Sequence, residues 1–230
     1  MRWPQPKELA WAVRQMEAEF RNWETSVYAP ASLKPRELVD PEIVGWWSEV
    51  REKGPWIQTF SGLCYPLLAP DASDVCLDDI AHAVAGLERY TGHARRVAGL
   101  HGYTVAQHSV HVSEIVPRED AFAALMHDSP EAYVGDASSP LKRCLSNFGY
   151  VERLSYLAIA KRFRLPFQLP PSVKHADLVL LATEKRDLMA PEPRPWLPLP
   201  EPLPERIRIW SADVAEERFR ERFEELSNHP

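Results

Sequence analysis

The chain has 230 residues, of which 45% are hydrophobic and 26% are charged, ordinary proportions for a soluble globular protein. This length allows one substantial core, or one domain with an appendage. The net charge is −6, with 27 Lys and Arg against 33 Asp and Glu, so the composition lacks the basic bias that is typical of proteins that bind DNA or RNA. A small anionic ligand would therefore need local positive charge or a metal ion.

The cysteines argue against two kinds of stabilising cross-link. Cys64, Cys76 and Cys144 are odd in number and widely spaced, without a C-x-x-C pair. This pattern disfavours both a disulfide framework and a cysteine zinc site. The first residues lack the apolar stretch of a signal peptide, and the apolar runs are too short to span a bilayer. We therefore expect a cytoplasmic protein.

Proline and apolar spacing together predict an all-α domain with little strand. Proline occurs 22 times and glycine 9 times. Because proline is rare inside helices, this usage predicts helices joined by stiff connectors. Apolar residues recur every three or four positions along most of the chain. Helices are expected over Lys7–Trp23, Pro41–Val50, Leu77–Tyr90, Val105–Pro117, Ala121–Met126, Val151–Phe163, Val173–Met189 and Ala212–Leu226.

Several helix starts carry a capping residue. Thr104 stands at capping-box spacing from Gln107, and Ser211 is the expected N-cap of the last helix. Ser129 is expected to cap a new turn after Pro130. The β-forming segment Thr59–Leu67 is expected to make a short strand pair.

The chain divides into three segments. Residues 1–55 are expected to be a helical appendage, with packing or dimerisation as its simplest role. Residues 56–190 hold the residues that can carry chemistry. In residues 191–230, seven prolines occupy fourteen positions up to Pro204 and predict an extended strap, which leads to the C-terminal helix.

The informative residues lie on successive expected helices. They are His108, the adjacent pair His127 and Asp128 after an apolar segment, and Asp177. One histidine alone is commonly structural, but an ionised aspartate at the end of a core helix needs a metal or a strong donor. Two imidazoles and two carboxylates suit one divalent transition metal, and Zn, Mn, Co and Fe are all compatible.

The order His…His-Asp…Asp resembles the signature of the HD-domain phosphohydrolases. Further stretches resemble the bacterial 5′-deoxynucleotidases of that family and their phage relatives, which include dATP triphosphohydrolases. Together they cover roughly Thr59 to Met189. These stretches are Ile80-Ala81-His82, Arg89-Tyr90, Thr104 to Ser109 (TVAQHS), Ala124 to Asp136 (ALMHDSPEAYVGD), Pro140-Leu141-Lys142, Ala176-Asp177 and Ala182-Thr183-Glu184.

The resemblance implies a fold and roles for individual residues. Residues 56–190 would form the HD phosphohydrolase domain, a helical bundle. The implied metal ligands are His108, His127, Asp128 and Asp177. The resemblance also implies that Glu131 and Asp136 orient or deprotonate the attacking water. Arg89 would bind the phosphate, and Lys142 would be a further cation near it.

Each of these roles has a plainer alternative. Glu131 and Asp136 could be a solvated helix end and a loop cap, and Lys142 could be a surface charge. Arg95 and Arg96 are close enough in sequence to take the place of Arg89. A further residue of interest is Glu184, which stands seven positions after Asp177 on the same helix face and could support a metal ligand.

The expected function is release of phosphate from deoxynucleoside 5′-monophosphates, with a nucleotide as the small-molecule partner and with neither nucleic acid nor membrane. Homo-oligomer formation is left open. One alternative is release of triphosphate from a dNTP, which the extra cations would favour. Another is a nonenzymatic nucleotide-binding or interaction protein with a structural metal, which would have no need of Glu131 and Asp136.

Overall fold

The computed structural model describes residues 6–28, 48–99 and 102–227, with the backbone alone over residues 19–28. These residues are all-α as expected, with one small two-stranded sheet. Their contacts group the chain into two compact units, which we call the first unit (residues 1–76 and 140–167) and the second unit (residues 77–139 and 168–230). This grouping cuts across the expected segments 1–55, 56–190 and 191–230, which stay a prediction about domains.

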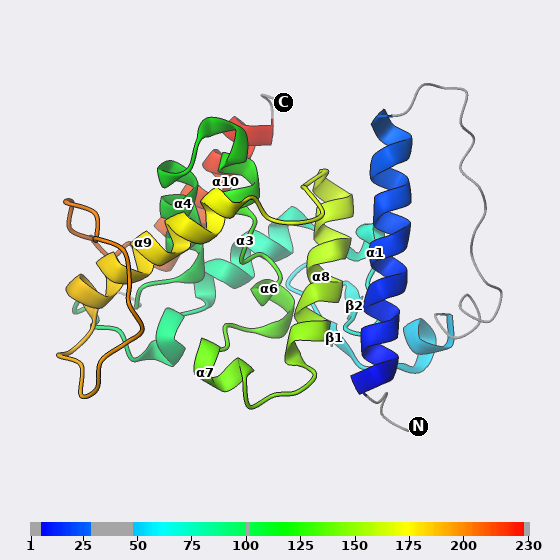
Figure 1. Ribbon diagram of the computed structural model, residues 1–230, viewed down its shortest axis with the longest axis horizontal. Coiled ribbons are helices and arrows are strands. Elements are labelled where there is room, and N and C mark those ends of the chain that lie inside the picture. The colour runs from blue at the N-terminus through cyan, green and yellow to red at the C-terminus, as the bar shows by residue number, and fades with distance from the viewer. Residues whose placement is uncertain (1–5, 29–47, 100–101, 228–230) are drawn as a thin grey trace. The chain divides into compact units, whose positions relative to one another are not determined.

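The first unit is built on two helices that lie side by side, α1 (Pro6–Tyr28) and α8 (Phe148–Phe163) (Figure 1). It also holds β1 (Trp56–Gln58), β2 (Cys64–Pro66) and the short 3₁₀ helix η1 (Ala72–Asp74). Of the helix expected over Pro41–Val50, residues 41–47 lie outside the described residues, and residues 48–53 are helical.

The expected strand pair is displaced toward the N-terminus. β1 and β2 pair antiparallel, with Gln58 opposite Cys64, so the first strand lies before Thr59. The residues between the strands form the turn instead. In that turn the Thr59 hydroxyl accepts a hydrogen bond from the Leu63 amide, and Gly62 takes a positive φ of 84°, which favours glycine.

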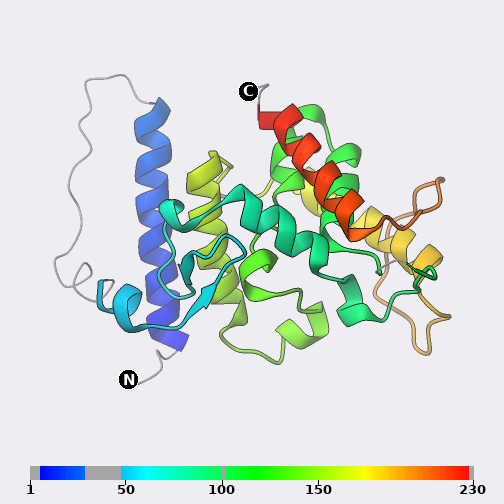
Figure 2. The same cartoon turned by 180° about the vertical axis from the view of Figure 1, so that it is seen from behind.

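The second unit contains the helices that carry the predicted site. Helix α10 packs on α3, α4 and α5, and α4 packs on α5 and α9, as Figure 2 shows from behind with α10 in red. A further short helix, α7 (Ser139–Lys142), crosses the boundary between the units. The elements of the second unit are α3 (Leu77–Gly86), η2 (Arg89–Gly92), α4 (Val105–Ile115), η3 (Arg118–Asp120), α5 (Ala121–Leu125), α6 (Glu131–Val134), α9 (Pro171–Leu188) and α10 (Ala212–Ser227).

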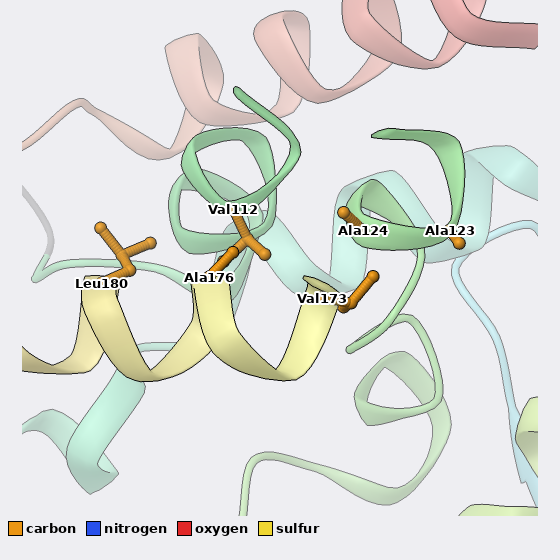
Figure 3. Packing of buried hydrophobic residues seen from close by; sticks show 6 residues of the cluster. All are labelled: Val112, Ala123, Ala124, Val173, Ala176 and Leu180. Carbon is orange, nitrogen blue, oxygen red and sulfur yellow. The ribbon is translucent and has the colours of Figure 1, made fainter. Parts of the chain in front are cut away.

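Small apolar residues hold three of these helices close together. In Figure 3, side chains of α9 point toward α4 and α5. Alanine at several of these positions lets the helix backbones approach closely. The cluster ends next to the chemistry, because Ala176 precedes Asp177 and Ala124 lies three residues before His127. Its buried members are Val112, Ala123, Ala124, Val173, Ala176 and Leu180.

Two of the three expected caps are present. The Thr104 hydroxyl accepts from the Gln107 amide at 3.2 Å, and the Ser211 hydroxyl accepts from the Val214 amide at 3.3 Å. The expectation for Ser129 is wrong: α6 begins after Pro130 without a side-chain cap. The Ser129 hydroxyl instead points back to the sulfur of Met126, at 3.5 Å.

The long expected helix through Tyr90 ends early. α3 stops at Gly86, and Arg89 begins the separate 3₁₀ helix η2. Within η2, Tyr90 and Thr91 both have left-handed backbone angles, with φ of 58° and 54°. Such angles are unfavourable for residues other than glycine and cannot continue an α-helix.

The strap returns along α9 and α4, held by buried side chains. The Thr183 hydroxyl accepts from the Leu203 amide at 2.9 Å, and Asp187 accepts from the Ile207 amide at 3.0 Å. The side chain of Gln107 donates to the Arg208 carbonyl at 2.7 Å and accepts from the Trp210 amide at 3.0 Å. Over the described residues, no helix combines the length and apolar character that crossing a membrane requires.

Candidate metal centre

The second unit brings three of the four expected ligands into one group. His108 lies on α4, His127 in the turn after α5, and Asp177 on α9. One potential ligand atom from each lies within 4.8 Å of the others. The fourth residue, Asp128, adjoins this group, since its Oδ2 lies 3.2 Å from Nε2 of His127 and 3.5 Å from Nε2 of His108.

Both histidines present an unused ring nitrogen to this group. Nδ1 of His127 lies 2.7 Å from the carbonyl oxygen of Ala124, and because a carbonyl only accepts, Nδ1 carries the proton. Nδ1 of His108 lies 2.6 Å from the carboxylate of Glu184, which also accepts. Nε2 of each ring is buried and makes no hydrogen bond among the described residues. A buried polar atom without a partner is costly, and a metal ion would satisfy both.

The spacing of the ligand atoms fits a small ion. Two ligands at tetrahedral positions, each roughly 2.0–2.2 Å from zinc, lie roughly 3.3–3.6 Å apart. Nε2 of His108 is 3.4 Å from Oδ1 of Asp177 and 3.5 Å from Oδ2 of Asp128. Nε2 of His127 is 3.2 Å from the same Asp128 oxygen. The residues present therefore fit a divalent metal, whose identity they do not select.

Glu184 holds His108 from behind. Its side chain is fully buried, and while Oε1 accepts from His108, Oε2 lies 3.3 Å from both Nε and Nη2 of Arg89. Oε2 also accepts from the hydroxyl of Tyr90. A carboxylate in this position fixes the tautomer and ring orientation of the histidine, which is the arrangement that supports metal-binding histidines in other proteins.

The carboxylates of the centre carry more negative charge than the cationic side chains beside them. Three carboxylates surround the histidines, and Arg89 neutralises one of them, with Nη1 3.4 Å from Asp128. Burial raises the pKa of Asp128 and of Asp177, but the histidines beside them lower both pKa values to well below the usual range. Lys174 also pairs with Asp177 at 2.8 Å, so one negative charge remains when both histidines are neutral, and a divalent ion would leave the centre with a net positive charge.

Without a metal, a proton on His108 supplies positive charge at the centre. Burial and Arg89 lower the pKa of His108, but Glu184 and Asp177 outweigh them and raise it to about 9. His108 is then an imidazolium at neutral pH, with its Nε2 facing Asp128 and Asp177. This is the position that a metal cation would share.

The backbone beside Arg89 is strained. Tyr90 and Thr91 take consecutive left-handed conformations, which cost on the order of 1–3 kcal/mol each in residues other than glycine. This conformation turns the Tyr90 hydroxyl onto Glu184. Strain of this kind concentrates at functional sites because the surrounding contacts must hold it in place.

The remaining expected residues lie in different settings. Glu131 is 4% exposed on α6, and its amide donates to the Asp128 carbonyl at 3.0 Å. Asp136 is half-buried after α6. Nη2 of Arg96 pairs with Glu88 at 2.7 Å, and Arg95 is exposed. Lys142 belongs to the first unit, where it pairs with Glu152 at 2.5 Å.

Tyr90 is the residue whose contact sequence reasoning missed. The motif Arg89-Tyr90 singled out its position, but only the strained turn sends its hydroxyl to Glu184. The sequence did indicate that Glu184 lies near the candidate ligands. Residues seven apart on a helix lie on the same face, and Glu184 is seven residues after Asp177 on α9.

The fold and the centre define an all-α protein with a possible metal-binding site of histidine and aspartate. No family model matches the chain. The chain is 41% identical over 133 residues to the uncharacterized protein YfdR of Escherichia coli (strain K12). The aligned region covers 58% of this chain and 72% of YfdR. The chain belongs to the family of YfdR. It is also 37% identical over 133 residues to the uncharacterized protein RCAP_rcc00048 of Rhodobacter capsulatus, covering 54% of this chain and 66% of that protein.

Proposed function

We propose that the chain is a cytoplasmic, metal-dependent phosphohydrolase of the HD type that releases phosphate from deoxynucleoside 5′-monophosphates. The observation that carries the proposal is the pair of buried Nε2 atoms of His108 and His127, which make no hydrogen bond and face Asp128 and Asp177. These four residues are the ones whose order in the sequence, His…His-Asp…Asp, resembles the signature of the HD-domain phosphohydrolases. The ion would be Zn, Mn, Co or Fe.

The four ligand residues would hold the ion, and the residues around them would handle substrate and water. A bound divalent ion would lower the pKa of water and screen the charge of the phosphate. Arg89 is buried at the centre and stays charged, because Glu184 and Asp128 raise its pKa against the effect of burial. A guanidinium in this position can donate to a phosphate oxygen.

Two carboxylates are the candidates for activating the attacking water. Glu131 is buried, and its amide is bonded to the carbonyl of the ligand Asp128, so its backbone position is fixed relative to the centre. Asp136 follows on the same short segment. We assign the general base to Glu131, because it is buried and its backbone is bonded directly to Asp128, whereas Asp136 lies five residues further along the chain.

The ion pairs of the cationic residues other than Arg89 favour a monophosphate over a triphosphate as the substrate. A triphosphate needs additional positive charge, and Arg96 and Lys142 are each already paired with a glutamate. Arg95 is the remaining candidate of this set. The monophosphate therefore stays the first choice of substrate, and the dNTP triphosphohydrolase the alternative.

The test is a phosphate-release screen over deoxynucleoside mono-, di- and triphosphates with Mn, Co, Zn and Mg. The expected result is metal-dependent release of orthophosphate from monophosphates, lost in His127→Ala. A matched control is His111→Ala, because His111 lies on α4 but outside the metal group. Release of triphosphate would select the alternative enzyme. Metal binding with no release from any nucleotide would overturn the enzymatic proposal.

A further inference from the structure

A groove of about 800 Å³ lies between the end of α9 and the start of the Pro-rich strap. It belongs entirely to the second unit. Its lining combines an aromatic ring, Trp196, with the cationic side chains of Arg95, Lys185 and Arg186. Apolar strap residues complete the wall, among them Leu197, which is 79% exposed.

The chain segment that carries Trp196 is anchored to α9. Its backbone amide donates to Oε2 of Glu192 at 3.2 Å, and the same oxygen pairs with Nζ of Lys185 at 2.5 Å. Nζ of Lys185 lies 5.3 Å from the centroid of the Trp196 ring. The backbone at Trp196 is therefore already held in place when a ligand binds, which lowers the entropic cost of binding.

The groove adjoins the candidate metal centre through Tyr90. The rings of Tyr90 and Trp196 lie 6.5 Å apart between centroids, at an interplanar angle of 44°. The hydroxyl of Tyr90 donates to Glu184, which in turn holds His108. Lys185 and Glu184 are neighbours on α9, so one turn of this helix faces both the groove and the centre.

The chemistry of the groove suits an aromatic ligand that carries hydrogen-bond acceptors. Arg186 is engaged with Asp187, and Lys185 with Glu192. The side chain of Arg95 is exposed and makes no hydrogen bond or ion pair with the described residues, while its amide is anchored to the Leu188 carbonyl at 2.8 Å. An indole ring beside free guanidinium donors is the combination that stacks on a nucleobase and meets its acceptor atoms.

We propose that this groove binds the base of the nucleotide whose phosphate lies at the metal centre, with Trp196 as the stacking surface. The proposal rests on the proposed function for the position of the phosphate. It assigns the strap a role in selecting substrates: it would favour phosphate esters that carry an aromatic base over those that do not.

The first experiment measures binding without hydrolysis. Deoxyadenosine, which has no phosphate, is titrated into the metal-loaded protein and its binding is followed by calorimetry. We expect binding to weaken roughly 5- to 150-fold in Trp196→Ala, the usual contribution of base stacking on an aromatic side chain. Trp196→Phe should keep most of the affinity, since it keeps a ring. Trp56→Ala is the matched control, because Trp56 is an exposed tryptophan of the first unit and does not line the groove.

The second experiment compares two substrates that share a phosphate. In Trp196→Ala, kcat/KM for deoxyadenosine 5′-monophosphate should fall by a similar factor, while kcat/KM for 2-deoxyribose 5-phosphate should stay within about twofold. An equal loss on both substrates would mean that Trp196 supports the fold or the metal centre, and would overturn the proposal.

The two proposals fail in different ways. Deoxyadenosine binding that depends on Trp196, without hydrolysis of any nucleotide, would support the groove and reject the phosphohydrolase. Phosphate release with deoxyadenosine binding unchanged by Trp196→Ala would support the enzyme and reject the groove. No binding of deoxyadenosine to the unaltered protein would also reject the groove.

Discussion

Glu184→Gln is the sharpest perturbation of the centre, because it removes a charge while nearly preserving the shape of the side chain. One carboxylate oxygen accepts from Nδ1 of His108 at 2.6 Å, and the other accepts from Arg89 and Tyr90. Both oxygens of the carboxylate accept, whereas an amide offers one acceptor and one donor. The variant cannot satisfy both sides.

Either orientation of the new amide leads to a loss that can be measured. If its oxygen faces His108, its NH₂ group meets the donors of Arg89, and a hydrogen bond to a charged group, about 1.5–3 kcal/mol of stability, is lost. If its oxygen faces Arg89 instead, its NH₂ group meets Nδ1 of His108. His108 must then carry its proton on Nε2, the atom that faces Asp128 and Asp177, and this proton blocks a metal ion.

We expect metal affinity to fall by roughly 10- to 100-fold, the usual effect of removing a residue that orients a metal-binding histidine. Calorimetric titration with Mn and Zn measures the affinity, and thermal unfolding followed by circular dichroism measures stability. Asp187→Asn is the matched control. Asp187 is also a buried carboxylate of α9 that pairs with an arginine, and its pKa is lowered to about 2 by Arg186 and neighbouring donors against the effect of burial.

Asp187→Asn should lower stability, because an amide keeps only one acceptor oxygen for Arg186, Arg206 and the Ile207 amide, but it should leave metal affinity unchanged. The reasoning about Glu184 would be refuted if Glu184→Gln bound metal as tightly as the unaltered protein and unfolded at the same temperature. Equal losses of metal affinity in both variants would show a general loosening of α9 instead of a specific role for Glu184.

Three further predictions concern the proton, the water and the phosphate. Because the folded-state pKa of His108 is raised from 6.5 to about 9, its proton stabilises the metal-free protein below pH 6.5, and this stability is lost as the pH rises through 9. A metal ion must displace the proton, so affinity should rise about tenfold per pH unit toward pH 9, with proton release visible in calorimetry in two buffers; a flat profile would contradict this. Glu131→Ala should lower kcat roughly 10²- to 10⁴-fold at unchanged metal content, and a change within a few-fold would move the role of base to Asp136. Arg89→Lys should lower kcat/KM by about tenfold or more, because an ammonium cannot span Asp128 and Glu184 and also reach a phosphate; full activity would mean that the wrong arginine was assigned.

The parts of the fold that follow from local pattern were predictable. The start of α4 at Val105 follows from Thr104, whose hydroxyl caps the helix, and the start of α10 follows from Ser211 in the same way. Apolar spacing placed α9 with Asp177 and Glu184 on one face. The expected ligands, three of which form the metal group, were chosen through the resemblance to the HD signature, while the cost of burying an ionised aspartate pointed to Asp128 alone.

The parts that depend on tertiary contacts were not predictable. The apolar stripe beginning at Leu77 favours a helix that continues to Tyr90, yet the chain leaves the helix at Gly86. Local preference opposes two consecutive left-handed residues, so only contacts from distant segments can maintain them. The hydrogen bond from Tyr90 to Glu184 joins residues 94 positions apart in the sequence. The hydrogen bond from Arg89 to the same carboxylate joins residues 95 positions apart. The position of the Arg89 guanidinium thus depends on α9 as much as on the Arg89-Tyr90 motif, and a variant of Glu184 should disturb Arg89 and His108 together.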